Sequence, residues 1–309
     1  MAARSLGEIS NAPPHIRAWL DRIEFHNTYD LASNLVAKAV VMRRIDVLNW
    51  FHNEGLFKES DYRAHDCCAL RLAGGNGFID VLNWMDEHGV ATQNDCRADF
   101  SGVLRWAASR GHSGVLEWLR NKGAATAEDC RAAKNDALRG AARGGHLNVL
   151  EWLRKQGAAT PDDCRADNRA MLIDAARGRR LDVLEWLREQ GAAAPDDCRS
   201  NKHTVMGTAV MMNNIQVLKW LHQQGAATPD DCRECFQLKN LKPFVCDEQI
   251  IEWFAERLEL HEMGGNHQEI WWRVLRKKVL LLILAGKTKK LRLPAELWEL
   301  VNEFAGNCA

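Results

Sequence analysis

Tryptophan recurs along this chain at a fixed interval of 34 residues, and a glycine and a cysteine follow the same interval. A period of about 20–50 residues is typical of stacked repeat arrays, in which each unit contacts only its neighbours. The sequence therefore predicts a repeat array rather than one or two globular cores. The recurring residues are Trp50, Trp84, Trp118, Trp152, Trp186 and Trp220, then Gly55, Gly89, Gly123, Gly157, Gly191 and Gly225, and finally Cys96, Cys130, Cys164, Cys198 and Cys232.

The period divides the chain into four segments. Six repeat units cover residues 35–238. The pattern recurs one residue early at Trp253, so residues 239–265 are interpreted as a degenerate repeat or cap. Residues 1–34 hold apolar residues out of register, as expected of an atypical N-terminal cap. We expect residues 266–309 to form a basic and amphipathic C-terminal helical segment.

Each unit is predicted to contain two antiparallel helices, as the unit 137–170 illustrates. Apolar residues within 147–153 have the spacing of a helix with a broad apolar face, and Gly157 can take the positive φ at which such a helix ends. Thr160 and Pro161 then form a helix start, with threonine at the N-cap and proline at the first position. A single unit leaves an apolar face bare, so it must stack on its neighbours.

The segment Ala141-Ala142-Arg143-Gly144-Gly145-His146-Leu147, followed by Val149-Leu150 and Gly157-Ala158, resembles the ankyrin repeat. These elements have the order of that family and recur over about two thirds of the chain. The resemblance implies an all-α fold, an α-solenoid of stacked ankyrin-like helix pairs. It also implies a non-catalytic role as a scaffold that binds another protein.

The units depart from the ankyrin pattern in two places. The family's Thr-Pro-Leu-His opening is replaced by Ala170-Met171-Leu172-Ile173-Asp174, and only two residues separate Gly157 from Thr160. We therefore expect a longer first helix and little or no β-hairpin finger. Tetratricopeptide arrays share the period, but the late tryptophan and the total of two tyrosines fit that family poorly.

The composition excludes several functional classes. Lys+Arg and Asp+Glu number 41 each, so no global charge favours nucleic acid or a membrane. The longest apolar run, residues 279–285, is far shorter than the roughly 20 residues of a membrane span. Ten cysteines without a secretory signal are typical of reduced thiols in a cytoplasmic or nuclear protein. No phosphate-binding loop or catalytic constellation appears, so we expect neither an enzyme nor a bound cofactor.

The recurring Trp and Cys residues are interpreted as core. Each tryptophan lies on the apolar face of its helix, which favours packing over a ligand cage. One cysteine per unit cannot reach the next across helices about 8–10 Å apart, so neither a disulfide ladder nor a metal ladder is expected. Cys232, Cys235, Cys246 and His261 have a faint zinc-site character, but their spacings match no standard site. We therefore predict no metal.

Two polar patterns accept a structural and a functional interpretation. Asp and Arg recur two residues apart, as in Asp163 and Arg165. Either the aspartate caps the first helix and the arginine bridges to an adjacent unit, or the charges grip a partner. His112 and His146 stand at the junction between the two helices. No nucleophile recurs near them, so a helix-start or turn hydrogen bond is the structural interpretation.

Residues that vary between units are predicted to contact the partner, because the scaffold positions repeat. Trp106 is the best candidate for a binding hot spot, since Trp and Arg dominate such sites and its equivalents share no packing role. Those equivalents are Lys38, Leu72, Gly140, Asp174 and Thr208. Arg105 and Arg139, in the adjacent register, are placed to frame the ring. The alternative is variable surface with no selected role. The predicted partner-binding residues are Arg105, Trp106, Lys134, Asn135, Arg139, Asn168, Arg169, Asp174, Lys202 and His203.

The C-terminal segment carries two further patterns. Residues 271–294 hold eight basic residues and no acid, which indicates a nuclear-import signal, a polyanion-binding patch or the solvated face of an apolar helix. Leu293-Pro294-Ala295-Glu296-Leu297 resembles the opening of an F-box, which implies docking to a cullin-type ubiquitin ligase with the solenoid as substrate receptor. An amphipathic helix that caps the last repeat explains the same residues. The expected partner is a protein, and ubiquitin-ligase components are expected under the F-box interpretation.

Overall fold

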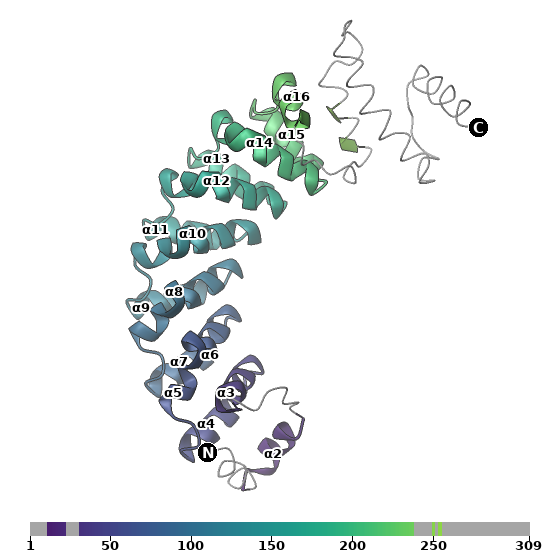
Figure 1. Ribbon diagram of the computed structural model, residues 1–309. Coiled ribbons are helices and arrows are strands. Elements are labelled where there is room, and N and C mark those ends of the chain that lie inside the picture. Colours follow the sequence, from purple (N-terminus) through teal and green to yellow (C-terminus); the bar gives the residue numbers. More distant parts are fainter. Residues whose placement is uncertain (1–10, 23–30, 238–248, 251–252, 255–309) are drawn as a thin grey trace, which may run out of the picture. The chain divides into compact units, whose positions relative to one another are not determined.

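The computed structural model describes residues 11–22, 31–237, 249–250 and 253–254 of the 309-residue chain. The chain forms two compact units, Met1–Asp197 and Cys198–Ala309, and each is described by itself. Every regular element among the described residues is a helix (Figure 1). The predicted fold class, an all-α solenoid of stacked helix pairs, is confirmed.

After α2, each repeat contributes a first and a second helix, and one first helix is divided into α5 and α6. The bounds of the helices are α2 Pro14–Leu20, α3 Leu31–Val41, α4 Ile45–Asn53, α5 Glu59–Tyr62, α6 Ala64–Gly75, α7 Ile79–Glu87, α8 Gln93–Ser109, α9 Ser113–Asn121, α10 Ala127–Gly144, α11 Leu147–Lys155, α12 Pro161–Arg177, α13 Leu181–Glu189, α14 Pro195–Met211, α15 Ile215–Gln223 and α16 Pro229–Gln237.

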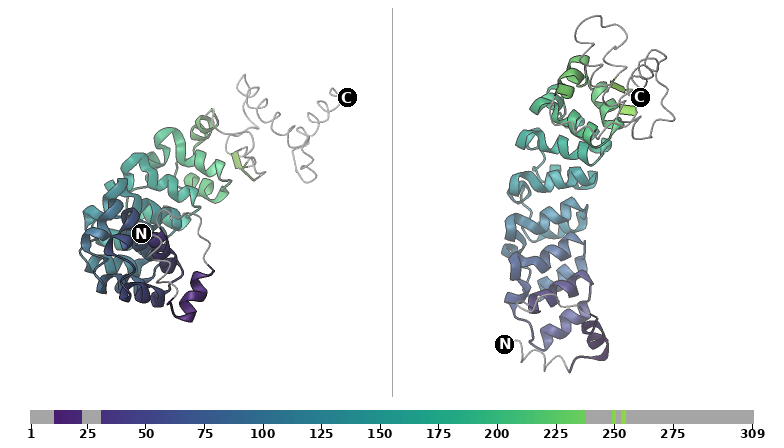
Figure 2. Two further views of the ribbon diagram at one scale, coloured as in Figure 1. Left: turned by 60° about the horizontal axis from the view of Figure 1, so that its bottom comes forward. Right: turned by 45° about the vertical axis from the view of Figure 1, so that its right-hand side comes forward.

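The first compact unit is built of two helix layers. Helices α3, α6, α8, α10 and α12 pack on one another in chain order and form what we call the first-helix layer. Helices α7, α9, α11 and α13 pack in the same order and form the second-helix layer (Figures 1 and 2). Small and branched apolar residues fill the space between the layers, as Ala141, Ala142, Val149 and Leu150 do with almost no exposed surface.

The recurring tryptophans join consecutive repeats of the second-helix layer. Each indole N–H donates to the residue 35 positions earlier, which precedes the tryptophan of the previous repeat. The bonds are Trp84 Nε1 to Asn49 Oδ1 (2.5 Å), Trp118 to Asn83 Oδ1 (2.9 Å), Trp152 to Glu117 Oε1 (2.6 Å) and Trp186 to Glu151 Oε1 (2.5 Å). Trp84, Trp152 and Trp186 are buried, and Trp50 and Trp118 are half-buried. This burial confirms the packing interpretation. The asparagine and glutamate oxygens supply the hydrogen-bond acceptor that a buried indole N–H needs.

The second compact unit contains most of α14, together with α15 and α16. Val217, Leu218, Trp220 and Leu221 of α15 are buried, so the apolar face predicted for a second helix is present here too. Cys232 and Cys235 of α16 are also buried. The predicted degenerate repeat, residues 239–265, lies almost wholly outside the described residues, as does all of 266–309.

The first helix of the repeat is not the single longer helix that we predicted. In α8 the backbone leaves the helix at Ala98 and passes through three left-handed residues before the helix resumes at Gly102. The same turn recurs one repeat away on either side. The left-handed residues are His65, Asp66 and Cys67, then Asp99, Phe100 and Ser101, then Ala133, Lys134 and Asn135, with Asp167 and Arg169 in the next repeat.

Side-chain hydrogen bonds within and between repeats stabilise this left-handed turn. A non-glycine residue in this conformation costs about 1–2 kcal/mol, although Asp and Asn tolerate it best. Arg105 donates to the carbonyl oxygens of Asp99 (2.9 Å) and Phe100 (3.1 Å), and so satisfies backbone groups that the interrupted helix leaves free. Buried Asn135 donates to the carbonyl oxygen of Asp163 in the next repeat (3.3 Å). The segment that we expected to extend the first helix is therefore a separate short helix.

The histidines at the helix junctions bond differently from our prediction. The ring of His146 makes no cap bond to its own helix. Its Nε2 lies 3.1 Å from the carbonyl oxygen of Ser109 in the preceding repeat, and a Cβ added to Gly111 would meet the ring at 2.6 Å. His112 stands over Gly77 in the same way. Each histidine therefore packs against the preceding repeat, and the glycine there has no side chain that would clash with the ring.

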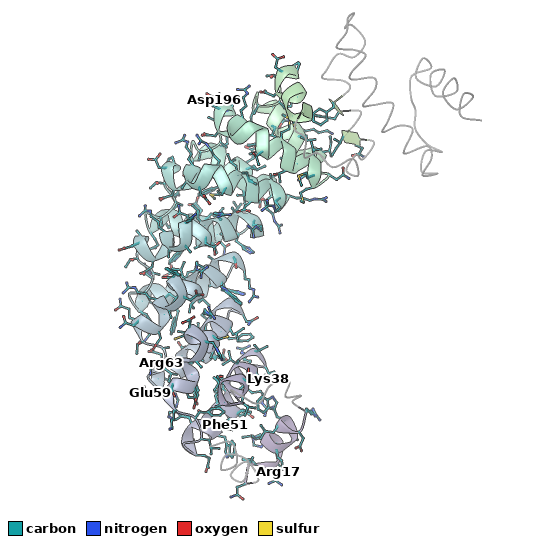
Figure 3. The ribbon with its side chains drawn as sticks, viewed as in Figure 1. Arg17, Lys38, Phe51, Glu59, Arg63 and Asp196 are labelled. Atoms are coloured by element: carbon teal, nitrogen blue, oxygen red, sulfur yellow. The ribbon has the colours of Figure 1, made fainter. Side chains whose placement is uncertain are left out.

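The recurring Asp and Arg form a regular Arg–Asp ladder. Each arginine donates through Nε to the aspartate 32 residues later. That aspartate also accepts a backbone N–H at the start of the next first helix, from a threonine in four cases and from Ala194 in the case of Asp197. The pairs are Arg63–Asp95 (2.9 Å), Arg97–Asp129 (2.8 Å), Arg131–Asp163 (2.7 Å) and Arg165–Asp197 (3.3 Å) in the first compact unit, and Arg199–Asp231 (3.0 Å) in the second. Figure 3 marks Arg63 beside Glu59, a further partner at 2.6 Å. The structural interpretation of the Asp–Arg pattern is confirmed.

We expect Asp163→Ala to lower the free energy of unfolding by about 2 kcal/mol, the combined size of the lost carboxylate half of a capping box and a weak ion pair. Asp163 accepts from the backbone N–H (3.0 Å) and hydroxyl (2.7 Å) of Thr160 as well as from Arg131. The matched control is Asp162→Ala, because Asp162 has the same charge and a 99% exposed side chain. Urea unfolding followed by circular dichroism measures both, and equal losses would contradict the ladder's role.

The same pair of variants tests a pH dependence. Burial alone would raise the pKa of Asp163, but its bonds from Arg131 and Thr160 outweigh burial and leave the pKa below the ordinary value. A lowered carboxylate pKa contributes stability that is present above the unfolded pKa of about 4 and is lost as the pH falls through the folded pKa. The stability difference between the wild type and Asp163→Ala should therefore shrink below pH 4. A difference that stays constant down to pH 2 would contradict this assignment.

Candidate functional site

Trp106 lies on the exposed side of the first-helix layer, in the second half of α8. Its side chain is 38% exposed, and the guanidinium of Arg110 lies 5.0 Å from the ring centroid. Arg110 in turn donates to the carbonyl oxygen of Gly75 on α6 (2.9 Å). A Cβ added at Gly75 would meet the Trp106 ring at 3.0 Å. The indole is thus held in one orientation between Arg110 and α6 and keeps part of its surface accessible.

The two arginines predicted to frame Trp106 are engaged elsewhere. Arg105 pairs with Asp136 of α10 (2.9 Å) and with Asp99 of its own turn (3.2 Å). Arg139 pairs with Asp167 (3.1 Å) and Asp174 (3.0 Å), both of α12. Both guanidinium groups are thus held by carboxylates. The ring of Trp106 lies instead under the guanidinium of Arg110 and close to the backbone of Gly75.

Two of the predicted contact residues are buried. The side chain of Asn135 bonds into the next repeat, and its residue is 9% exposed. Asp174 is 1% exposed and accepts from Arg139, Arg143 and Arg177. The assumption that residue variation marks exposed positions therefore fails at these two residues. A polar side chain can be buried at a variable position when the neighbouring repeat supplies its partners.

The other predicted residues divide into two groups. Lys134 is exposed at the left-handed turn of α10, and Arg169 is half-buried and bonds to Asp197 (3.3 Å). The side chains of Asn168, Lys202 and His203 lie outside the described residues, so their roles stay predictions. Of the ten predicted residues, the structure brings Arg139 and Asp174 into direct contact and places Arg105 beside Trp106 on α8.

Phe100 is an exposed aromatic residue that the sequence analysis missed. It lies in the left-handed turn of α8, six residues before Trp106, and its side chain is 73% exposed. Its equivalents are Asp66, Lys134, Asn168, Lys202 and Phe236. Four of these five are polar, so the comparison between repeats that selected Trp106 also points to Phe100. Two exposed aromatic residues six positions apart are unusual on a solvated surface, and aromatic residues are enriched at protein interfaces.

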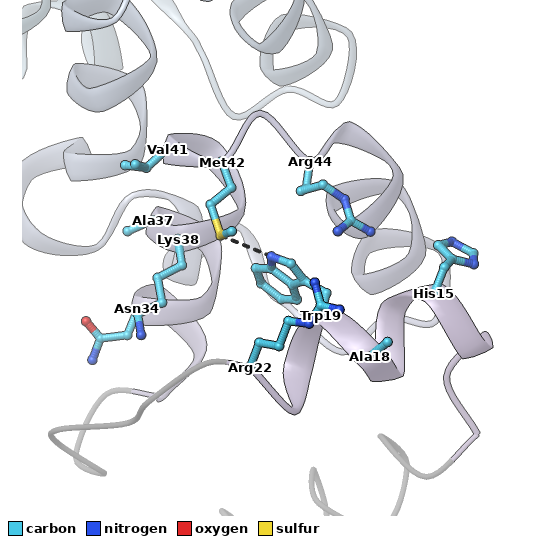
Figure 4. A pocket seen from close by; sticks show the side chains of 10 residues that line it. All are labelled: His15, Ala18, Trp19, Arg22, Asn34, Ala37, Lys38, Val41, Met42 and Arg44. Atoms are coloured by element: carbon cyan, nitrogen blue, oxygen red, sulfur yellow. Dashed lines mark hydrogen bonds between the residues drawn. The ribbon is translucent and has the colours of Figure 1, made fainter.

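An open cleft of about 820 Å³ lies beside α2 and α3 (Figure 4). Its wall includes Trp19, whose indole N–H donates to the sulfur of Met42 (3.2 Å), and the guanidinium of Arg44 lies 5.9 Å from the Trp19 ring. Lys38 and Arg22 add positive charge to the lining. None of the predicted partner-binding residues lines this cleft.

The recurring cysteines are buried in the described part of the chain. Burial raises the pKa of the Cys96, Cys130 and Cys164 thiols to about 12 each. Among the described residues, no group of three or more His, Cys, Asp and Glu side chains is arranged to hold a metal ion. Cys246 and His261 of the weak zinc pattern lie outside those residues.

We expect iodoacetamide at pH 8 to leave Cys96, Cys130 and Cys164 unmodified in the native protein, because only the thiolate reacts and burial suppresses it. Cys68 is partly exposed and serves as the internal control that is labelled first. Peptide mass spectrometry after timed labelling measures each site, and all four should react in urea. Native labelling of Cys130 at the rate of Cys68 would show that the periodic thiols are accessible.

Two models of known protein families match parts of this chain. One model, described as ankyrin repeats in three copies, matches residues 104–195, and a second, described as ankyrin repeats in many copies, matches residues 172–222. Residues 104–222 are ankyrin repeats. A comparison with curated proteins found no match.

Ankyrin repeats indicate a protein–protein interaction scaffold, and proteins built from them are typically non-catalytic binding scaffolds. The matched residues include α10, α11, α12 and α13 and almost all of the second half of α8, with Trp106. The F-box-like segment has no family match and lies outside the described residues. No described helix is long and apolar enough to cross a membrane.

Proposed function

We propose that this chain is a non-catalytic scaffold that holds a protein partner on the first-helix layer of its first compact unit, with Trp106 at the centre of the contact. The observation that carries this proposal is the orientation of Trp106. The ring is held by Arg110 and Gly75 and is still 38% exposed. A large aromatic side chain that is already ordered loses little conformational entropy on binding, which is the physical basis of aromatic hot spots.

The surroundings of Trp106 support a protein partner. Exposed Phe100 adds apolar area on the same helix, and Lys134 adds an accessible charge on the neighbouring helix α10. Arg105, Arg139 and Arg169 are partly exposed and held by carboxylates, so they form a rigid polar border. An apolar centre with a polar border is the usual anatomy of a protein interface. Buried Asn135 and Asp174 hydrogen-bond to neighbouring repeats and hold the exposed residues in place, and we do not expect them to contact the partner.

The proposal is tested by affinity purification with the full chain as bait, followed by calorimetry on the purified partner. The wild type, Phe100→Ala and the control Arg154→Ala are compared. Arg154 is a suitable control because it lies on the second-helix layer and its side chain is 46% exposed. We expect one partner that Phe100→Ala weakens and Arg154→Ala leaves unchanged. A partner lost with Arg154→Ala and retained by Phe100→Ala would place binding on the other layer.

The alternative, a ubiquitin-ligase adaptor, rests on residues 293–304 alone. No observation on the described residues favours it. If the purified complex contained cullin-type ligase components that a chain shortened before Leu293 failed to bind, the adaptor function would be supported.

A further inference from the structure

A cluster of arginines surrounds the buried carboxylate of Asp174 in the first-helix layer. Asp174 Oδ1 accepts from Arg143 Nη2 (2.7 Å) and from Arg177 Nη1 (3.1 Å), and Asp174 Oδ2 accepts from Arg139 Nε (3.0 Å). The carboxylate is 1% exposed, whereas the side chains of Arg143 and Arg177 are 51% and 49% exposed. One buried anion from α12 thus positions two half-exposed guanidinium groups of adjacent repeats. Because both bond the same oxygen, their donor nitrogens are no more than about 6 Å apart.

The cluster has more positive charge than its carboxylates neutralise. Three arginines contact Asp174, and the second carboxylate in the network, Asp167, pairs with Arg139 alone. Arg180 extends the cluster, since its Nε donates to the main-chain oxygen of Arg143 (3.4 Å). Within the described residues no carboxylate pairs with Arg180. At least two positive charges therefore remain unbalanced at this end of α10 and α12.

The cluster also has more donors than acceptors. A guanidinium carries five N–H groups. Arg177 uses one nitrogen on Asp174, and Arg143 uses two. The remaining N–H groups of these half-exposed side chains are available to a second acceptor. Several guanidinium groups in fixed positions are the arrangement that recognises carboxylate and phosphate oxygens, since each presents parallel donors to a planar or tetrahedral oxyanion.

Other repeats lack this arrangement. The residues equivalent to Arg143 and Arg177 are Val41, Gly75, Ser109 and Met211, and Asp174 is the one carboxylate in its own register. Next to it, Arg179-Arg180 occupy the places of the Gly-His pairs of the two preceding repeats. Arg179 has φ +58°, a left-handed conformation for which its equivalents Gly111 and Gly145 are better suited. Arginines near a helix C-terminus complement the helix dipole, but that role does not require three of them on one carboxylate.

We propose that Arg143, Arg177 and Arg180, positioned by Asp174 and Arg139, bind an oxyanion carried by a side chain of the partner protein, either a carboxylate or a phosphate. This inference rests on the proposed scaffold function and adds the chemistry of the partner. A continuous nucleic-acid backbone fits less well. Asp136 and Asp167 have side chains 47% and 37% exposed on the same helices, so they would repel neighbouring phosphates, whereas a discrete anion on a peptide avoids them.

The test uses fluorescent ten-residue peptides and the full chain, so it needs no identified partner. Three peptides share a Gly/Ser backbone and carry four glutamates, two phosphoserines or no charge, and a ten-nucleotide oligo(dT) is the fourth probe. Anisotropy titration is expected to show binding of the glutamate peptide, the phosphoserine peptide or both, and none of the neutral peptide. The peptide that binds identifies the source of the oxyanion. Binding by neither acidic peptide, or tighter binding of oligo(dT) than of both, would overturn the proposal.

Variants then locate the binding. Arg143→Ala/Arg177→Ala is expected to weaken the acidic peptide by about tenfold or more, as loss of charged hydrogen bonds does. The matched control, Arg154→Ala/Arg188→Ala, removes the same charge from second helices, where these arginines are 46% and 47% exposed and paired with Glu151 and Glu185. Arg180→Ala leaves the bonds to Asp174 intact and removes one contact between repeats, so it should weaken binding with only a small change in melting temperature. Equal affinity of the wild type and the first double variant would refute the assignment.

The outcome is separable from that of the scaffold proposal. If the acidic peptides fail to bind while Phe100→Ala still weakens a purified partner, the oxyanion site is wrong and the scaffold function stands. If the peptides bind through Arg143 and Arg177 but a purified partner is indifferent to Phe100→Ala, the oxyanion site stands and the aromatic centre is misplaced.

Discussion

Trp152→Ala is expected to lower the free energy of unfolding by about 3–5 kcal/mol, the usual loss for a large buried aromatic side chain. Trp152 is 7% exposed in α11, and its indole N–H donates to Glu117 of the preceding repeat (2.6 Å). The variant therefore removes packing inside one repeat and a hydrogen bond between two. Urea unfolding followed by circular dichroism at 222 nm is the suitable measurement, because the substitution itself alters fluorescence.

Two control variants separate these contributions. Trp152→Phe keeps an aromatic ring and removes the donor, so its loss should be about 1–2 kcal/mol, the size of one bond to a charged acceptor and some packing. Trp50→Ala removes a half-buried ring from the first predicted repeat and should have a smaller effect than Trp152→Ala, because a terminal repeat has fewer neighbours. An unchanged urea midpoint for Trp152→Ala would show that these tryptophans are not core.

Trp106→Ala is expected to weaken binding of the purified partner by at least about 2 kcal/mol, or about 30-fold, as loss of an interface hot spot does. Trp106 differs from Trp152 in its exposure, which is 38% against 7%. Its contacts are the guanidinium of Arg110 and the small residue Gly75 rather than a closed apolar pocket. The stability loss should therefore stay below about 1 kcal/mol, as for most partly exposed positions.

Calorimetry and urea unfolding on the same samples decide between the roles of Trp106. Trp106→Phe should retain most of the affinity, since the ring still packs beside Arg110 and presents an apolar face. Equal affinity and equal stability of Trp106→Ala and the wild type would mean that Trp106 is incidental surface. A stability loss as large as that of Trp152→Ala would place Trp106 in the core instead.

Short-range patterns made most of the architecture predictable. The 34-residue period, the apolar face of the second helix and the Thr-Pro-Asp-Asp helix start all depend on residues within a few turns of one another. Asp163 illustrates this, because its position three residues after Thr160 is sufficient to predict a helix cap. The recurrence of the arginine also favoured a bridge to an adjacent repeat, but its partner, Asp163 in the case of Arg131, was identified by the structure.

The tertiary structure decided the features that depend on contacts between repeats. Asp174 is buried because Arg139 and Arg143, 35 and 31 positions earlier, neutralise it across the helix interface. A comparison of the sequences of the repeats instead predicts that an aspartate at a variable position is exposed. The left-handed turn within the first helix contains no glycine, and in α10 buried Asn135 binds this turn to the next repeat by donating to the carbonyl oxygen of Asp163. Sequence alone determined the repeat and its caps, because local propensity and periodicity are properties of neighbouring residues. Only the folded stack decided which charges are buried and which remain accessible, because desolvation and pairing depend on residues brought together from different repeats.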